Sequence, residues 1–389
     1  MSETPFKIDI PDSEINLLRQ KLELARLPDE LEEAGWAYGV PLADVKRLVD
    51  KWRATFDWKK HEAEINKLPM FTRDIEIDGF GSLNIHYVHQ KRPGHFLEVE
   101  KILPLLADSS PDYPSFHVVA FSLPGFGFSE TAKKKGFSIN QYSETGHKLM
   151  LALGYPEYVV QGGDWGGIIS RRQSSMYAHK HVKAWHTNFP FVAGPPKLFS
   201  HPRSYLTHLV KPYTAREKAG IARRQWFAER GRGYFAEQST QPQTIGYSLA
   251  DSPVGLLTWI YEKLVNWTDD YPWDDDEVLQ WVSVYWFSRS GPAASVRIYY
   301  ESVASNDFYQ SGATSVPLGI SYFPKEMSLS PRSWSKTIGN VVFESEHESG
   351  GHFAAHEKPV DLVSDLRKMF GKGGPAYGVV SGKNGYAIP

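Results

Sequence analysis

No cysteine occurs among the 389 residues of this sequence. Its absence excludes disulfide bonds, thiolate metal sites and a cysteine nucleophile, and it favours a reducing, cytoplasmic location. The sequence also lacks an apolar run of the roughly 18 residues that a membrane-spanning helix needs. Its first residues show no basic segment followed by an apolar core, as a signal peptide would have. We therefore expect a soluble cytoplasmic protein.

An excess of charge of either sign is missing as well. The 43 basic and 45 acidic residues give a formal net charge of −2, and no basic segment stands out. Binding to nucleic acid or to an anionic membrane therefore has no electrostatic basis in the composition. Aromatic residues, by contrast, make up 14% of the chain. This content indicates either a bulky core or an apolar substrate pocket.

Apolar spacing predicts helices first and then strands that alternate with helices. The predicted helices cover residues 12–33, 41–54 and 139–153, and another begins near Ile168. The predicted strands are a hairpin at 71–77 and 83–89, and single strands at 116–121, 158–162 and 183–189. Such alternation is typical of a doubly wound α/β core. We expect residues 116–121 to be buried in its parallel sheet.

A mostly helical stretch rich in tryptophan and tyrosine interrupts this alternation. We interpret it as a cap inserted into the α/β core, which resumes with apolar strands near residues 318–322 and 340–343. The predicted organisation is a helical extension at 1–70, the core at 71–190 and 315–371, the cap at 191–314, and a tail at 372–389. The tail is rich in glycine and lysine, and we expect it to be poorly ordered.

Residues 158–167 (YVVQGGDWGG) form an apolar strand that runs into a glycine-rich turn with Asp164 at its apex. A sharp strand-to-helix turn of this kind lifts a nucleophile above a parallel sheet. A carboxylate at the apex indicates attack on a carbon that can release an oxygen or a halide, with an alkyl ester as the intermediate. The alternative is an ordinary turn with an exposed aspartate.

A carboxylate nucleophile needs a base for the second step. His352 lies in a loop after a predicted strand (GGHFAA) and has a side chain suited to general base catalysis near neutral pH. Glu326, after the preceding strand, is the candidate that orients it. The order of Asp164, Glu326 and His352 is that of hydrolases built on this turn. The alternatives are a loop histidine without a catalytic role and a solvated surface glutamate.

Together these segments resemble the microsomal-type epoxide hydrolases, a branch of the α/β-hydrolase superfamily. The resemblance covers nearly the whole chain. Residues 4–110 resemble that family's N-terminal extension, and the turn around Asp164 and the loop around His352 resemble its nucleophile and histidine motifs. Residues 251–257 (DSPVGLL) and 323–326 (FPKE) also resemble family segments. The resemblance implies an α/β-hydrolase fold with a helical cap.

The resemblance further implies conversion of apolar epoxides to vicinal diols without a metal or organic cofactor. Two cap tyrosines of the family hydrogen-bond and protonate the epoxide oxygen, and Tyr234 and Tyr299 match them, with Tyr300 as the alternative to Tyr299. The backbone N–H of Trp165 is the expected oxyanion donor. The expected partners are an epoxide and water, and detoxification or aromatic-hydrocarbon catabolism are the expected roles. The sequence is compatible with a homodimer but does not fix the oligomeric state.

The sequence departs from the family at the oxyanion motif. The family places an apolar strand and a His-Gly-x-Pro-Gly turn after the first hairpin, whereas only Pro93 and Gly94 of that turn are found here. Roughly 15 residues are missing relative to the family pattern. Because the absent strand belongs in the middle of the sheet, we expect its two neighbours to lack a partner. A rearranged hairpin, an error in defining the coding sequence and a degraded, inactive relative are the three explanations.

Two other functions stay open at this point. The same aspartate would serve a haloalkane or haloacid dehalogenase, in which halide-binding donors replace the tyrosine pair. A catalytically inactive hydrolase fold that binds apolar ligands is the alternative from outside the enzymes, because the oxyanion turn is incomplete.

Overall fold

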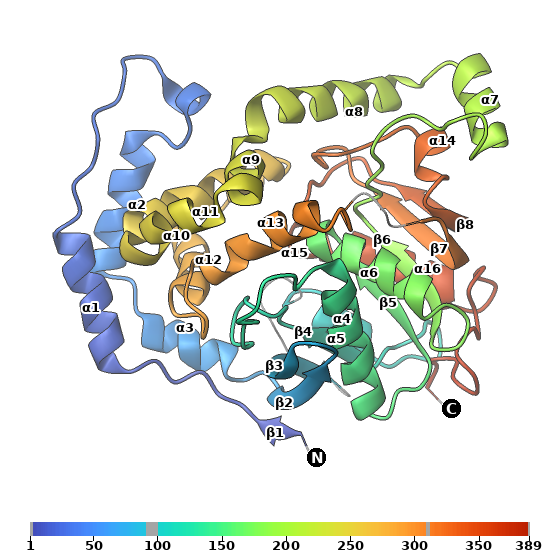
Figure 1. The fold of residues 1–389 in the computed structure, drawn as a ribbon, viewed down its shortest axis with the longest axis horizontal. Helices are drawn as coiled ribbons and strands as arrows, with labels where there is room; N and C mark the ends of the chain where they lie inside the picture. Colours follow the sequence, from blue (N-terminus) through green and yellow to red (C-terminus); the bar gives the residue numbers. More distant parts are fainter. Residues whose placement is uncertain (1–2, 91–99, 309–311, 388–389) are drawn as a thin grey trace.

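The computed structural model describes residues 3–90, 100–308 and 312–387. In Figure 1 the N-terminal helices lie on one side, the strands on the other, and a second group of helices above and between them. The strands are β1 (Thr4–Pro5), β2 (Met70–Ile77), β3 (Gly81–Gln90), β4 (Val118–Phe121), β5 (Tyr158–Gly162), β6 (Val182–Thr187), β7 (Thr314–Tyr322) and β8 (Gly339–Glu346).

The helices fall into three groups along the chain. Those up to β6 are α1 (Asp12–Glu23), η1 (Gly35–Tyr38), α2 (Leu42–Ala54), α3 (Trp58–Ile65), α4 (Leu103–Ala107), α5 (Ile139–Ala152) and α6 (Asp164–Met176). Between β6 and β7 lie α7 (Pro202–Val210), α8 (Ala215–Trp226), η2 (Phe227–Gly231), α9 (Gly233–Thr240), α10 (Pro242–Asp251), α11 (Pro253–Trp267), α12 (Asp275–Trp286), η3 (Ala294–Val296) and α13 (Arg297–Ala304). The last are α14 (Arg332–Ser335), α15 (Ala354–Glu357) and α16 (Pro359–Phe370).

The strands form two four-stranded sheets, in the orders β1-β2-β3-β4 and β5-β6-β7-β8. The first sheet is antiparallel and the second is parallel. Within the described residues, β4 and β5 therefore each have an edge without a strand partner. The sequence predicted two such strands beside a missing central one.

Residues 116–121 were predicted to form a strand buried in the parallel sheet. A strand is present at 118–121, but it is neither buried nor in that sheet. β4 pairs antiparallel with β3, and all four of its residues are only half-buried. The three middle residues of β5 are half-buried too. The physical reason is that a strand is fully buried in a parallel sheet only when it has a neighbour on both sides, and here each of these strands has one.

The N-terminal helices pack against the helices that precede β7. Leu48 and Trp52 of α2 belong to the same buried cluster as Leu256 of α11 and Leu279 of α12. Burying one leucine side chain contributes about 1.5–3 kcal/mol to stability. Figure 1 shows this arrangement, with α1 and α2 beside α10, α11 and α12.

The helix predicted over residues 12–33 ends ten residues early, at Glu23. Ile15, Leu18 and Leu22 face the core as expected, but Leu24 is 86% exposed because it lies on the opposite face of the helix. Pro28 also opposes a longer helix, since proline lacks the backbone N–H and disfavours helical geometry in the residue before it.

The expectation of a poorly ordered tail is wrong. The backbone N–H of Ser115 donates to the carbonyl oxygen of Gly385 at 2.7 Å. The backbone N–H of Ala387 donates to the carbonyl oxygen of Ser110 at 3.2 Å. Ala376 is buried against α16 and its neighbours. The tail thus packs on the loop that leads into β4, and these contacts could not be inferred from its glycine-rich composition.

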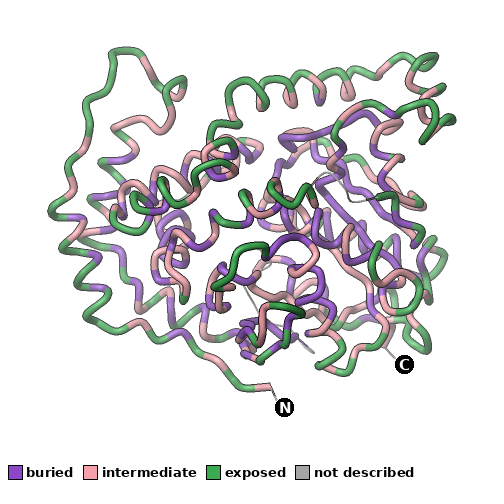
Figure 2. The backbone as a smooth tube through the Cα atoms, in the orientation of Figure 1, coloured by how far each residue is buried: buried purple, intermediate pink, exposed green. Residues whose placement is uncertain are grey.

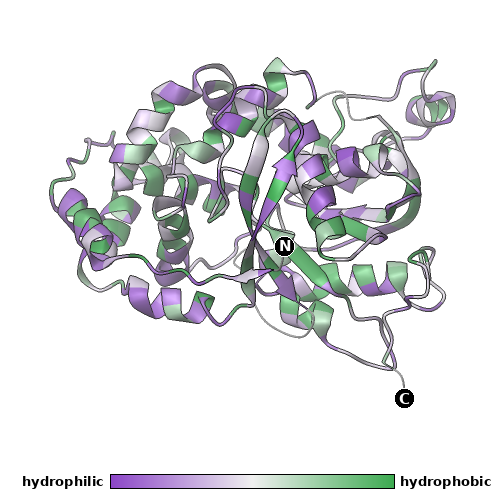
Figure 3. Cartoon of the chain, turned by 60° about the horizontal axis from the view of Figure 1, so that its bottom comes forward, coloured by the Kyte–Doolittle hydropathy of each residue, from purple (hydrophilic) through white to green (hydrophobic). Residues whose placement is uncertain are grey.

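Burial follows the strands and the inward faces of the helices. Figure 2 shows β6 and β7 as buried, while α7 and α8 are mostly half-buried or exposed. Figure 3 shows long hydrophobic stretches on the strands and hydrophilic residues on the outer helices. None of the helices in the three described ranges is both long and apolar enough to span a bilayer.

Candidate active site

The turn between β5 and α6 holds Asp164 in a backbone conformation that few residues adopt. Its φ is 44°, in the left-handed region. The turn is tight because a Cβ at position 162 would lie 2.3 Å from the backbone of Gly166. Glycine is therefore required at that position, and the side chain of Asp164 stands out from the end of the strand.

Helix α6 begins at Asp164 and not near Ile168, so the predicted start was four residues late. Gly166 and Gly167, which favoured a longer turn, lie inside the helix. Only Gly167 faces the strand, where a Cβ would lie 3.1 Å from the carbonyl oxygen of Gly162, so its lack of a side chain lets α6 approach β5 closely. The carboxylate consequently lies at the N-terminus of a helix, where the helix dipole stabilises negative charge.

Both carboxylate oxygens of Asp164 have partners. The backbone N–H of Trp165 donates to Oδ1 at 2.7 Å, and His352 Nε2 lies 3.0 Å from Oδ2. The backbone N–H of Trp165, which was expected to be an oxyanion donor, therefore points at the carboxyl group of Asp164. The second expected donor belongs to the segment around Pro93 and Gly94, which lies outside the described residues.

Glu326 and His352 form a buried pair. His352 Nδ1 lies 3.0 and 2.9 Å from the two carboxylate oxygens of Glu326, which is fully buried. A bridge between Lys325 and Gly351 brings the loop after β7 against the histidine loop. The alternative of a solvated surface glutamate is thereby wrong. The three residues predicted from chain order are connected in series, with His352 between Glu326 and Asp164.

The protonation of His352 follows from its two carboxylate neighbours. Burial lowers the pKa of His352, but the negative charges and hydrogen bonds of Glu326 and Asp164 outweigh this effect and raise the pKa to about 10. The imidazole therefore carries a proton at neutral pH as long as both carboxylates are charged.

Glu357 holds the histidine loop in place, and sequence reasoning missed it. Its carboxylate accepts backbone N–H bonds from Gly351 and Phe353, both at 3.1 Å, and from Asp269 at 2.9 Å. Asp269 in turn accepts the N–H of Gly350 at 2.8 Å. These bonds tie the loop to the end of α11. The only signal in the sequence was a glutamate five residues after the histidine.

The two predicted cap tyrosines lie together above the nucleophile turn. The rings of Tyr234 in α9 and Tyr299 in α13 are 5.8 Å apart, and Tyr299 is 4.9 Å from the ring of Trp165. Tyr300 is 42% exposed and points elsewhere. Burial raises the pKa of both Tyr234 and Tyr299, and the nearby charge of Asp164 raises it further. Both phenols are therefore protonated at neutral pH and can donate.

Aromatic side chains surround these groups. Trp267 and Phe189 lie edge-on to His352, with ring centroids at 5.1 and 5.6 Å. The ring centroids of Phe308 and Trp165 are 5.6 Å apart, and those of Phe235 and Tyr299 are 5.4 Å apart. Such walls exclude water and suit an apolar ligand.

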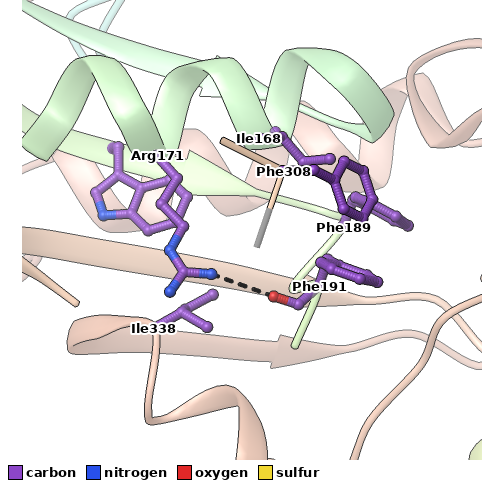
Figure 4. Close-up of a pocket in the computed structure, with 8 residues that line it drawn as sticks. Ile168, Arg171, Phe189, Phe191, Phe308 and Ile338 are labelled. Atoms are coloured by element: carbon purple, nitrogen blue, oxygen red, sulfur yellow. Dashed lines mark hydrogen bonds between the residues drawn. The ribbon is translucent and has the colours of Figure 1, made fainter. Parts of the chain in front are cut away.

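A small pocket lies beside α6, next to these walls. Figure 4 shows Arg171 in it, donating a hydrogen bond to the carbonyl oxygen of Phe191 at 3.3 Å. The lining consists of Gly167, Ile168, Arg171, Trp185, Phe189, Phe191, Phe308 and Ile338. None of these is a predicted site residue, so the pocket lies beside the start of α6 and does not include Asp164.

Two family models match the chain. The model of the epoxide hydrolase N terminus matches residues 3–111, close to the predicted extension, and that of the α/β hydrolase fold matches residues 89–204. Epoxide hydrolase 1 of Sus scrofa is 33% identical over 407 aligned positions, which cover 94% of this chain and 88% of the pig protein.

Solved structures agree with this result. The structure of Aspergillus niger epoxide hydrolase is 34% identical, with a TM-score of 0.81 and coverage of 94% of this chain and 95% of that one. Juvenile hormone epoxide hydrolase from the silkworm Bombyx mori gives 27% identity, a TM-score of 0.83, and coverage of 94% and 93%. The chain thus has the α/β-hydrolase fold and belongs to the epoxide hydrolase family.

Proposed function

We propose that this protein converts apolar epoxides to vicinal diols through an ester on Asp164. One observation carries the proposal. The Asp164 carboxylate is bonded on one side to the N–H of Trp165 and on the other to a His352–Glu326 pair, with the half-buried phenols of Tyr234 and Tyr299 close by. Nucleophile, oxyanion donor, base and acid are thus within one aromatic-lined site.

In the first step, Oδ2 of Asp164 attacks an epoxide carbon while Tyr234 and Tyr299 bind the ring oxygen. The leaving alkoxide needs a proton, and a neutral phenol can supply one. Oδ1 then becomes the carbonyl oxygen of the ester and already lies at the Trp165 N–H. That donor stabilises the oxyanion when water attacks in the second step.

The charge of Asp164 links the two steps. Once the ester forms, this carboxylate is neutral, and one of the two charges that hold the proton on His352 is gone. The pKa of His352 must then fall, because a negative charge near an imidazole favours its protonated form and one such charge has been removed. The released proton restores the donor tyrosine, and the neutral imidazole activates the water. Glu326 keeps the ring oriented throughout.

Neutralising Asp164 is therefore expected to lower the pKa of His352. In the Asp164→Asn variant we expect the value to fall from about 10 toward the ordinary ~6.5. NMR titration of the His352 ring signal measures this pKa, and the signal is assigned by its absence from the His352→Gln variant. The raised pKa also makes stability depend on pH. In the unaltered protein it adds a contribution to the free energy of unfolding that is complete below ~6.5 and is lost as the pH rises through about 10. Asp9→Asn, at an exposed site, is the control, and an equal pKa in both variants would contradict this account.

Removing both phenols is expected to reduce epoxide opening by at least ~10². The Tyr234→Phe and Tyr299→Phe double variant keeps the rings but loses the proton donors, so the ester on Asp164 should form slowly. Single-turnover formation of that ester from styrene oxide, followed by mass spectrometry, measures the effect. Tyr300→Phe is the matched control. Undiminished ester formation, together with halide release from 1-chlorohexane, would instead favour the dehalogenase.

Three further statements are proposals that rest on the sequence. We propose that residues 191–314 act as the cap, between the core segments 71–190 and 315–371. The extension at 1–70 and the tail at 372–389 complete this division. A cytoplasmic location and a homodimer stay predictions.

A further inference from the structure

A buried cation lies beside the cap tyrosines. Lys263, in α11, is 8% exposed, and its ammonium group lies over the ring of Tyr234, 4.7 Å from the centroid. The rings of Trp259 and Trp267 lie 5.4 and 5.9 Å from the same nitrogen. Glu262 forms an ion pair with it at 2.5 Å.

Burial of this charge is costly for the fold. Desolvation lowers the pKa of Lys263, and the ion pair with the part-exposed Glu262 only partly opposes this. An apolar side chain of similar length would fill the same space without that cost. Packing alone therefore does not account for a lysine at this position.

We propose that Lys263 is a positioning residue that makes Tyr234 the proton donor, by stabilising the phenolate that Tyr234 becomes when it protonates the opening epoxide. This inference rests on the proposed function of the site. A neutral phenol ring attracts a cation only through its quadrupole, whereas a phenolate carries a full negative charge. The interaction therefore strengthens as the proton leaves, and only interactions that strengthen toward the transition state accelerate a reaction.

The geometry assigns different tasks to the two tyrosines. Lys263 lies over the ring face of Tyr234 and not at its hydroxyl, so it does not take the place of the epoxide oxygen. Tyr299 instead meets the edge of Trp165 at an interplanar angle of 89°. Burial raises the pKa of Tyr234 and the charge of Arg232 lowers it only partly, so giving up its proton is unfavourable without a further compensating cation. Tyr234 is then the acid, and Tyr299 is a hydrogen-bond donor that holds the oxygen.

The step balances in atoms and charge. The bond between Oδ2 of Asp164 and the epoxide carbon forms, the carbon–oxygen bond of the ring breaks, and the phenol proton of Tyr234 moves to the leaving oxygen. The resulting phenolate takes up the proton that His352 releases when Asp164 is esterified. Lys263 keeps its own proton throughout.

The test compares Lys263→Met, which keeps the length of the side chain, with Lys263→Arg, which keeps the charge. With styrene oxide, we expect Lys263→Met to slow ester formation roughly 10- to 100-fold and to leave ester hydrolysis unchanged. Lys263→Arg should stay within about threefold of the unaltered protein. Quenched-flow single turnovers separate the two steps.

The same change in the Tyr234→Phe background isolates the coupling. Phenylalanine keeps the cation–ring contact but cannot become a phenolate, so a second substitution at Lys263 should have no further effect on ester formation. An equal loss in both backgrounds, or an equal loss in both half-reactions, would mean that Lys263 only supports the packing, and the inference would be overturned.

A binding measurement does not depend on turnover. Acetophenone has an oxygen that accepts a phenol hydrogen bond, and ethylbenzene has nearly the same shape without it. Monitored by tryptophan fluorescence, acetophenone binding should weaken several-fold in Lys263→Met while ethylbenzene binding stays the same. Equal weakening of both would overturn the inference. Absence of an ester on Asp164 in the unaltered protein would instead refute the proposed function, and acetophenone would still report on Lys263.

Discussion

Replacing Asp164 by alanine should abolish epoxide hydrolysis, with a loss of at least ~10⁴ in turnover. No other described carboxylate lies at the end of β5 with an N–H donor on one oxygen and the His352 pair on the other. Without it, neither the ester nor the attack of water on that ester can occur. The measurement is diol formation from styrene oxide together with the mass of the protein after a single turnover.

Labelled water distinguishes this route from direct attack on the epoxide. Over many turnovers in ¹⁸O water, the label should accumulate in the carboxylate of Asp164, because water attacks the ester carbonyl. Asp9→Ala removes a carboxylate whose side chain is 92% exposed and serves as the control, with activity unchanged. Label that appears in the diol during the first turnover, with none in Asp164, would rule out the ester.

Asp164, Glu326 and His352 could be predicted as candidate site residues because each one is tied to a local pattern. Asp164 has glycines on both sides that only a tight turn explains, and Glu326 and His352 follow successive strands of the parallel sheet. Since the carboxyl ends of parallel strands meet at one edge, chain order was sufficient to bring the three together. Tyr234 and Tyr299 came from the resemblance alone.

Other features depend on contacts between distant segments, which no local pattern records. Beyond its spacing from His352, Glu357 gave no signal, because its partners are backbone N–H groups, one of which lies 88 residues away in the chain. No local pattern in the sequence distinguishes Lys263 from other polar positions in a helix. The tail was expected to be disordered from its composition, yet it packs on the loop before β4 through bonds that composition does not encode.

The split between β4 and β5 leads to the second large expected effect. Inserting about 15 residues between Lys91 and Arg92, as an apolar strand that ends in His-Gly-x-Pro-Gly, should join the two sheets. The pig epoxide hydrolase aligns over 407 positions, more than the 389 residues of this chain, so relatives carry residues that have no counterpart here.

Two separate gains are expected from this insertion. Pairing with β4 and β5 buries half-exposed apolar residues such as Val119 and Val160 and satisfies the open strand edges, which should raise the midpoint of thermal unfolding. The turn supplies the second oxyanion donor, and one such donor is worth about 10²–10³ in rate. Calorimetry and steady-state diol formation measure the two effects.

Two control insertions of equal length separate these causes. A strand without the turn, in which His-Gly-x-Pro-Gly is replaced by a glycine–serine sequence, should raise the unfolding midpoint but add little to the rate. A wholly glycine–serine insertion should do neither. If the complete insertion leaves both the unfolding midpoint and the rate unchanged, the two sheets are stable without a strand between them. The oxyanion must then be stabilised with Trp165 as its main backbone donor.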